Sequence, residues 1–227
     1  METTEQGIIF AFNNLNRNKM KNLSAFLLFI LYVQFNAAFS QTTEILYDDF
    51  SDNRNHWQEG KTAVSDVKVD VARGMYQINH KSKETNKAWT AWTDITINES
   101  KNFRITAQFY KEKGVTNYGY GLLWGGREKN YYSFLVSPGG YYCVGKVVDG
   151  DWQDITPEGW YASETVSQGR HAFNKLTLSK IGDTYHFEVN DHKVATMKCG
   201  PFFGNKLGFN VNNKQKIMVD WIKVEYI

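Results

Sequence analysis

The chain has 227 residues, and its 26 basic and 24 acidic side chains leave a formal net charge of +2. This length suits one all-β domain, or at most two small domains, with a sizeable core. An aromatic content of 15%, with 18 Gly and 3 Pro, indicates a folded chain of many strands and tight turns and argues against disorder. Because the charges are interspersed and form no polybasic tract, we expect neither nucleic acid nor an anionic membrane as a partner.

The amino-terminal residues are typical of an export signal. Lys19 and Lys21 precede an apolar run at 23–33, and small residues follow at Ala38 and Ser40. This order is that of a Sec signal peptide, which predicts cleavage after Ser40 and a periplasmic or extracellular mature protein. The apolar run is shorter than the roughly 20 residues that span a bilayer, so we expect removal rather than a membrane anchor.

The export-signal pattern also predicts where the mature domain begins. Residues before Met20 have the composition of a spurious upstream extension, and Met20 is the more natural first residue. Residues 1–40 are then the signal segment, and 41–227 form a single mature domain. No cysteine lies near the cleavage site, which argues against a lipoprotein anchor.

Cys143 and Cys199 are the two cysteines of the chain. In an oxidising compartment they could form one disulfide, or they could remain buried thiols that behave as small apolar side chains. Neither lies in a Cys-x-x-Cys or Cys/His spacing, so we expect no metal at them.

Period-two alternation of apolar residues recurs from Ile45 onward, with turn residues between the runs. One expected strand carries Phe103, Ile105, Ala107 and Phe109 on its core face. A meander starting at 176 turns at Gly182–Asp183 and again at Asn190–Asp191, because Gly, Asn and Asp tolerate positive φ. The roughly one dozen runs predict an all-β fold, a two-sheet antiparallel β-sandwich of jelly-roll type, with a barrel as the alternative.

The segment from Tyr118 to Val148 contains more aromatic residues than a core of its size needs. It is predicted to form three consecutive antiparallel strands, and the surplus aromatic residues indicate a binding surface. Within the strand at 131–137, alternation predicts two faces. The core face carries Tyr132, Phe134 and Val136, and the opposite face carries Tyr131, Ser133 and Leu135.

Short motifs follow one another in a characteristic order along residues 45–227. They include Tyr47-Asp-Asp-Phe-Ser-Asp-Asn, Gly119-Tyr-Gly-Leu-Leu-Trp-Gly, Tyr131-Tyr-Ser-Phe, Gly150-Asp-Trp and Val219-Asp-Trp-Ile-Lys-Val. In this order the chain resembles the concanavalin A-like lectin/glucanase superfamily, and most closely its laminin-G-like and keto-disaccharide hydrolase (domain of unknown function 1080) jelly rolls of secreted bacterial proteins. The resemblance implies a concanavalin A-like jelly roll. Because that superfamily holds both sugar-binding modules and glycosidases, it does not choose between them.

Carboxylates are the residues that a glycosidase needs, as a pair across the scissile bond. The local pairs are Asp48/Asp49, Asp149/Asp151, Asp151/Asp154 and Asp220/Glu225. The pairs within 149–154 lie in a predicted hairpin turn, where turn geometry favours Asp without catalysis. The Glu-x-Asp-x-x-Glu strand of family-sixteen glucanases is absent from the sequence. We therefore assign no catalytic residue, although folding could bring separate acids such as Glu99 and Glu188 together.

A structural calcium is the one cofactor that the acids suggest. Asp48, Asp49 and Asp52 open the domain, and Asp220 lies in its last strand. In related jelly rolls the first and last strands lie side by side near a calcium, which prefers carboxylate and carbonyl oxygens. Solvated turn acids are the alternative. The five histidines show no metal-binding spacing.

Aromatic side chains are the candidates for ligand contact, because sugar rings stack their C–H faces on Trp and Tyr while their hydroxyls bond to polar groups. The predicted contact residues are Trp89, Trp92, Trp124, Tyr131, Trp152 and Trp160. Core packing is the alternative for aromatic residues in strands, and we prefer it for Trp57 and Trp221.

The sequence thus favours a secreted, non-catalytic recognition module that binds carbohydrate through an aromatic-lined sheet face. Its expected partner is a glycan or a cell-surface polysaccharide. Two alternatives stay open: a glycoside hydrolase-like enzyme with acids from separate strands, and a structural or protein-interaction domain of laminin-G type.

Overall fold

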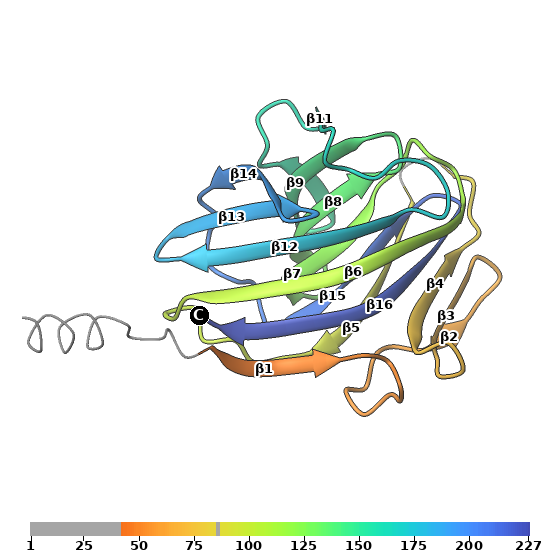
Figure 1. Ribbon diagram of the computed structural model, residues 1–227, viewed down its shortest axis with the longest axis horizontal. Coiled ribbons are helices and arrows are strands. Elements are labelled where there is room, and N and C mark those ends of the chain that lie inside the picture. Colours follow the sequence, from red (N-terminus) through yellow and green to blue (C-terminus); the bar gives the residue numbers. More distant parts are fainter. Residues whose placement is uncertain (1–41, 85–86) are drawn as a thin grey trace, which may run out of the picture. The chain divides into compact units, whose positions relative to one another are not determined.

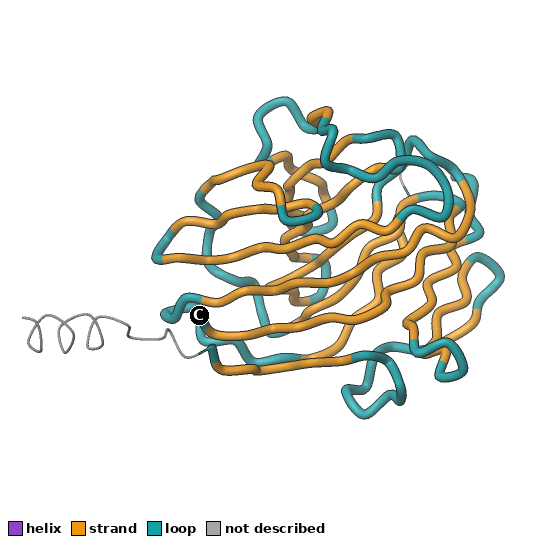
Figure 2. Tube along the Cα trace, in the orientation of Figure 1, coloured by secondary structure: helices purple, strands orange, loops and turns teal. Residues whose placement is uncertain are grey.

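Two antiparallel β-sheets pack face to face in the computed structural model, which describes residues 42–84 and 87–227 (Figure 1). The predicted signal segment at 1–40 lies outside the described residues. In the described part of the chain every regular element is a strand, and the connections are loops and turns (Figure 2). None of its residues belongs to a helix long and apolar enough to cross a membrane. The predicted all-β, two-sheet fold is confirmed.

The larger sheet has nine strands. They are β1 (Thr43–Asp48), β2 (Gly60–Lys61), β3 (Ser65–Asp70), β4 (Met75–His80), β6 (Phe103–Gly114), β12 (Phe173–Ile181), β13 (Thr184–Val189), β14 (His192–Met197) and β16 (Gln215–Tyr226). Their order is β14-β13-β12-β6-β16-β4-β3-β2. The first strand, β1, pairs with the carboxyl-terminal half of β16, so the two ends of the domain lie side by side.

The smaller sheet has seven strands. They are β5 (Ala88–Asp94), β7 (Tyr120–Arg127), β8 (Asn130–Ser137), β9 (Tyr141–Val148), β10 (Asp151–Asp154), β11 (Tyr161–Ala162) and β15 (Lys206–Asn212). Their order is β10-β9-β8-β7-β15-β5, with β11 paired to β9. The segment from Tyr118 to Val148 supplies β7, β8 and β9 as neighbouring antiparallel strands, as predicted.

The core lies between the inner faces of the two sheets, and alternation along each strand fills it. The residues of β6 that were predicted to face the core are fully buried, namely Phe103, Ile105, Ala107 and Phe109. Aromatic rings dominate one end of this core. Trp57 stacks on Phe209 with ring centroids 4.9 Å apart, and Phe50 and Tyr76 pack around them. Core packing is thus confirmed for Trp57.

The predicted hairpin turns adopt the backbone conformations that their residues favour. Gly182 joins β12 to β13 at φ +57°. Asn190 and Asp191 join β13 to β14 at φ +52° and +66°. Both central residues of that second turn are left-handed, which matches the right-handed twist of the flanking strands.

The acids at the start of the domain do not gather into a metal-binding group. The Asp48 carboxylate is buried and accepts hydrogen bonds from Phe50 N, Asn55 Nδ2 and Trp57 Nε1, each 2.7 Å long. Asp52 instead pairs with exposed Arg54. Among the described residues no three His, Cys, Asp or Glu side chains are arranged to hold a metal ion. The structure therefore gives the calcium hypothesis no support.

Cys143 and Cys199 are free thiols, the first on β9 of the smaller sheet and the second in the connection between β14 and β15. Cys143 is paired in register with Leu135, which faces away from the core, whereas Cys199 packs against the core. Burial raises the pKa of the Cys199 thiol to about 12 and raises that of Cys143 further. Of the two alternatives for these residues, the structure has unpaired thiols, with Cys143 buried and Cys199 partly buried.

Candidate functional site

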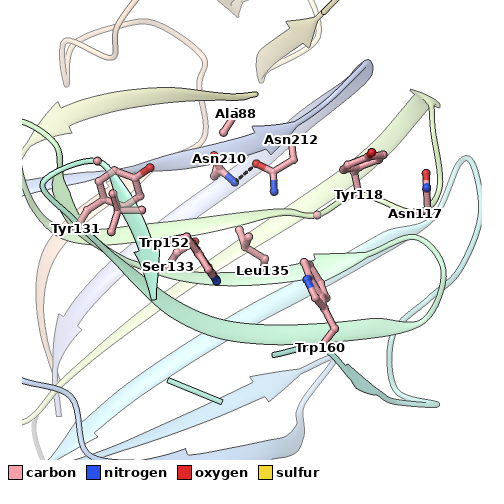
Figure 3. A pocket seen from close by; sticks show the side chains of 13 residues that line it. Ala88, Asn117, Tyr118, Tyr131, Ser133, Leu135, Trp152, Trp160, Asn210 and Asn212 are labelled. Carbon is pink, nitrogen blue, oxygen red and sulfur yellow. Dashed lines mark hydrogen bonds between the residues drawn. The ribbon is translucent and has the colours of Figure 1, made fainter. Parts of the chain in front are cut away.

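The outer face of the smaller sheet carries the candidate site. Alternation along β8 sends Tyr132, Phe134 and Val136 into the core, as predicted. The residues between them, Tyr131, Ser133 and Leu135, line a groove of about 440 Å³ on the opposite face. The other lining residues are Ala88, Asn117, Tyr118, Gly119, Val147, Gly150, Trp152, Trp160, Asn210 and Asn212. Figure 3 shows Tyr131 near one end of this groove and Tyr118 near the other.

Glycines make room for the large rings on this face. A Cβ atom on Gly119 would lie 2.5 Å from Cη2 of Trp160, and one on Gly145 would lie 2.2 Å from Cζ2 of Trp152. These distances are shorter than van der Waals contact, so neither position accepts a side chain while the indole stays in place. The glycines in the 118–148 segment thus seat two tryptophans that come from a different part of the chain.

Trp152 is held on β10 at the edge of the sheet. This short strand pairs with β9, and the register places Trp152 opposite Val147 on the outer face. The indole Nε1 donates a hydrogen bond of 2.7 Å to Asp154 Oδ1. The ring is still 43% exposed, so one face is available to a ligand.

Trp160 lies in the loop between β10 and β11, and buried Thr156 fixes that loop to β9. The Thr156 hydroxyl lies 2.6 Å from the carbonyl oxygen of Gly159 and 3.1 Å from that of Val144. The backbone N–H of Thr156 also donates to the Val144 carbonyl. With its loop anchored on both sides, Trp160 stays beside the groove while remaining 41% exposed.

Tyr131 is supported by Trp92 from β5. Their rings meet edge to face with centroids 5.3 Å apart. Trp92 in turn lies against Gly208 of β15 and Gly126 of β7, where Cβ atoms would come within 2.6 Å and 2.9 Å of its ring. Burial raises the pKa of the Tyr131 hydroxyl, which keeps it protonated and able to donate a hydrogen bond. Trp92 therefore positions Tyr131 rather than lining the groove itself.

Polar side chains from β15 and β8 complete the floor. Asn210 Nδ2 donates to Asn212 Oδ1 over 2.7 Å, and both residues line the groove with Ser133 (Figure 3). Asn210 is 4% exposed and Ser133 is fully buried, yet Asn210 Oδ1 and Ser133 Oγ have no hydrogen-bond partner among the described residues. Buried polar atoms are almost always paired, so these two atoms of the groove floor still have hydrogen-bonding capacity for a ligand or for water.

A buried amide ties this floor to the larger sheet. Gln215 of β16 donates from Nε2 to the carbonyl oxygens of Asn212 and Tyr118, over 2.6 Å and 3.1 Å. Its Oε1 accepts a hydrogen bond from Lys111 Nζ. Lys111 has no exposed surface, and burial together with the nearby Arg170 charge lowers the pKa of its amino group to about 8. The backbone on both sides of the groove is thus set by one buried network.

A second, smaller hollow of about 330 Å³ adjoins the first. Asn117 and Trp160 line both, so the two form one track across the sheet face. The second hollow ends at Tyr141, whose side chain is also exposed.

Three of the six predicted contact residues, Trp89, Trp92 and Trp124, do not line the groove. Trp124 is fully buried and stacks on Tyr132 with centroids 5.5 Å apart, because β7 alternation turns it inward with Tyr120 and Leu122. Trp89 is opposite Val211 in register and packs against the core. Neither lines the groove. The structure brings together Tyr131, Trp152 and Trp160, with Trp92 behind them.

The lining of the groove contains no Asp, Glu, His, Lys or Arg side chain. The Asp154 carboxylate accepts the hydrogen bond from the Trp152 indole and does not line the groove. Of the turn acids, Asp149 occupies the predicted turn with φ +55°, whereas Asp151 and Asp154 lie on β10. The groove can therefore stack rings and exchange neutral hydrogen bonds, but it offers no carboxylate pair of the kind that cleaves a glycosidic bond.

Sequence reasoning missed Asn210, Asn212 and Ser133 as functional residues. A signal for the two asparagines was present, since they alternate with buried Phe209 and Val211 along one strand. Amides at two successive outward positions of a strand are unusual, because Asn is depleted from strands.

No protein-family model matches this chain, and no curated protein sequence matches it either. Solved structures do resemble it. The carbohydrate recognition domain of Emp47p is 13% identical, with 84% of this chain and 99% of that chain covered and a TM-score of 0.55. A carbohydrate esterase of Shiga toxin-encoding bacteriophage phi24B is 11% identical, with 82% and 99% covered and a TM-score of 0.52.

A third structure is the CBM2 module of the evolved Dit protein of Lactobacillus casei BL23 phage J-1. It is 10% identical, with 82% of this chain and 96% of that chain covered and a TM-score of 0.51. At such identities the similarity concerns the fold. The chain shares the two-sheet β-sandwich fold of these proteins.

Proposed function

We propose that this protein is an exported, non-catalytic carbohydrate-binding module that holds a glycan in the groove of its smaller sheet. One observation carries the proposal: two half-exposed indoles, each seated on a glycine, lie beside a floor of neutral hydrogen-bonding groups. Stacking on Trp152 and Trp160 suits the apolar faces of sugar rings, while Asn and Ser suit their hydroxyls.

The structural neighbours support the same class of ligand. Two of the three are described as a carbohydrate recognition domain and a CBM2 module, and the third as a carbohydrate esterase. The lack of acidic side chains in the groove lining favours binding over hydrolysis. A shallow, open groove of this kind should bind in the micromolar to millimolar range, roughly −8 to −4 kcal/mol.

A glycan array followed by calorimetric titration of the best ligand tests this proposal. We expect the double variant Trp152→Ala, Trp160→Ala to lose binding. Tyr47→Ala is the matched control, because Tyr47 is an exposed aromatic residue on the larger sheet. An array on which no glycan binds would overturn the proposal, and so would undiminished binding by the double variant. Release of reducing sugar by the wild-type protein would overturn the non-catalytic part.

Export is the second part of the proposal. It rests on the signal pattern at 19–40 and on the predicted cleavage after Ser40. Amino-terminal sequencing of the protein recovered from the periplasm or medium should begin at Gln41. Recovery of the uncleaved chain in the cytoplasm would contradict it.

A further inference from the structure

We propose that the groove selects an uncharged sugar, and that Asn210 and Asn212 recognise two adjacent hydroxyl groups on it. This inference rests on the proposed function and specifies its ligand. It follows from the directions and charges of the polar groups on the floor.

The amide of Asn210 has a defined orientation. Its Nδ2 donates to Asn212 Oδ1 over 2.7 Å, which directs Oδ1 of Asn210 away from that bond. This oxygen has no partner among the described residues and almost no accessible surface, so a ligand hydroxyl reaches it when the Asn210 amide turns toward the groove. An acceptor left unpaired in a buried position costs about 1–3 kcal/mol, and a ligand hydroxyl that donates to it would recover that cost.

Asn212 presents the complementary group. Because its Oδ1 is already occupied by Asn210, its Nδ2 remains as the donor, and Figure 3 shows this nitrogen directed into the groove. An acceptor and a donor on neighbouring outward positions of β15 match two adjacent hydroxyls, of which one donates and the other accepts. The unpaired Ser133 hydroxyl from β8 lies in the same floor, just below its accessible surface, and it can serve as donor or acceptor.

Because no lining side chain carries a formal charge, we expect the groove to prefer uncharged sugars over anionic ones. A carboxylate or sulfate set against the floor of this groove would lose hydration on the side that meets the floor without meeting a lining cation, and it would lie next to the Asn210 amide. Burying an unpaired charge costs far more than burying a hydroxyl that finds its partners. We therefore expect neutral glycans to bind and the corresponding uronic acid or O-sulfated glycans to be rejected.

The test compares matched sugars on the mature protein. Neutral oligosaccharides that bind are compared with their uronic acid and O-sulfated counterparts, and with deoxy analogues that lack one ring hydroxyl each. We expect at least a tenfold preference for the neutral form. We also expect one adjacent pair of hydroxyls whose removal weakens binding about tenfold.

Single substitutions test whether the weaker binding of the deoxy sugars is due to the lost contact with Asn210 or Asn212. Asn210→Leu should weaken binding of the parent sugar but leave the affinity for the relevant deoxy analogue nearly unchanged, which a purely structural role would not produce. Ser133→Ala, which removes only a hydroxyl, gives a second reading if Asn210→Leu fails to fold. Asn79→Leu on the larger sheet is the control.

The failures are distinguishable. If no glycan binds at all, the proposed function fails. If binding depends on Trp152 and Trp160 but acidic glycans bind as well as neutral ones, the proposed function stands and this inference is overturned. The same holds if Asn210→Leu weakens parent and deoxy sugars equally.

Discussion

The indole of Trp152 lies against Gly145, so closely that a Cβ atom on the glycine would stand 2.2 Å from Cζ2 of the ring. The two residues come from the adjacent strands β10 and β9, and the hydrogen bond from Trp152 Nε1 to Asp154 holds the ring over this gap. Because Gly145 has no side chain, the half-exposed Trp152 ring can lie directly on the backbone of the sheet. The same relationship recurs between Gly119 and Trp160.

Gly145→Ala tests this seating directly. The added methyl group displaces the Trp152 ring, so we expect glycan affinity to fall about tenfold. Because the ring is exposed on its other side, it can move without opening a core cavity, and the unfolding free energy should change by less than about 1 kcal/mol. Gly60→Ala is the control, since a Cβ atom there meets nothing within 4 Å. Calorimetric titration that shows equal affinity for both variants would contradict the seating.

Trp124 and Trp152 should separate stability from binding. Trp124→Ala removes a fully buried indole between the sheets, which should cost about 3–5 kcal/mol of unfolding free energy. Trp152→Ala should change stability by less than about 1 kcal/mol while weakening glycan binding. Urea denaturation monitored by circular dichroism measures the first effect. A Trp124→Ala variant that keeps full stability and loses binding would mean that this ring faces the ligand after all.

Asp48 should stabilise the start of the domain through hydrogen bonds rather than through a metal. Its buried carboxylate accepts three hydrogen bonds, so Asp48→Ala leaves the Trp57 indole N–H and two other donors unpaired and should cost at least about 2 kcal/mol. Asp52→Ala, which breaks only an exposed pair with Arg54, should cost about 0–1 kcal/mol. Thermal unfolding with and without added calcium measures both. A large calcium-dependent stabilisation lost in Asp48→Ala would contradict this account.

Lys111 should make stability depend on pH in the alkaline range. Burial lowers the pKa of its amino group from 10.5 to about 8, whereas the unfolded chain keeps the ordinary value. Between pH 8 and 10.5 the unfolded state therefore binds more protons than the folded state, so the penalty for burying the charge is relieved as pH rises. Below pH 8 the penalty is constant.

The comparison with Lys111→Met isolates this effect, because the other titrating groups are common to both proteins. The unfolding free energy of the wild type, relative to the variant, should be flat below pH 8 and should rise between pH 8 and 10.5. Denaturant titrations at a series of pH values measure it. A difference that is flat throughout, or that falls, would contradict the lowered pKa.

Much of the fold could be predicted because alternation along a strand is a local property. The core faces of β6 and β8 and the left-handed turn at Asn190–Asp191 follow from neighbouring residues alone. The pairing of β1 with β16 joins residues about 180 positions apart in the chain. The sequence analysis expected the first and last strands to lie side by side only in connection with a calcium site, and the structure gives that site no support.

The site was harder to predict because it depends on which strands are neighbours. Trp152 and Trp160 were chosen from their residue type. The glycines that seat them lie just before β7 and on β9, and the asparagines of the groove lie on β15. Trp124 shows that residue type alone does not predict whether a tryptophan contacts a ligand. It shares its face of β7 with Tyr120 and Leu122, so the same alternation rule, applied there, places it in the core.

The indole N–H resonances of the seven tryptophans offer the most direct measurement of the central claim. In a nitrogen–proton correlation spectrum, titration with a neutral oligosaccharide that binds should shift the indole signals of Trp152 and Trp160. The signals of the core residues Trp57 and Trp124 should stay in place. If the ligand binds while the signals of Trp152 and Trp160 remain unchanged, the groove on the smaller sheet is not the binding site.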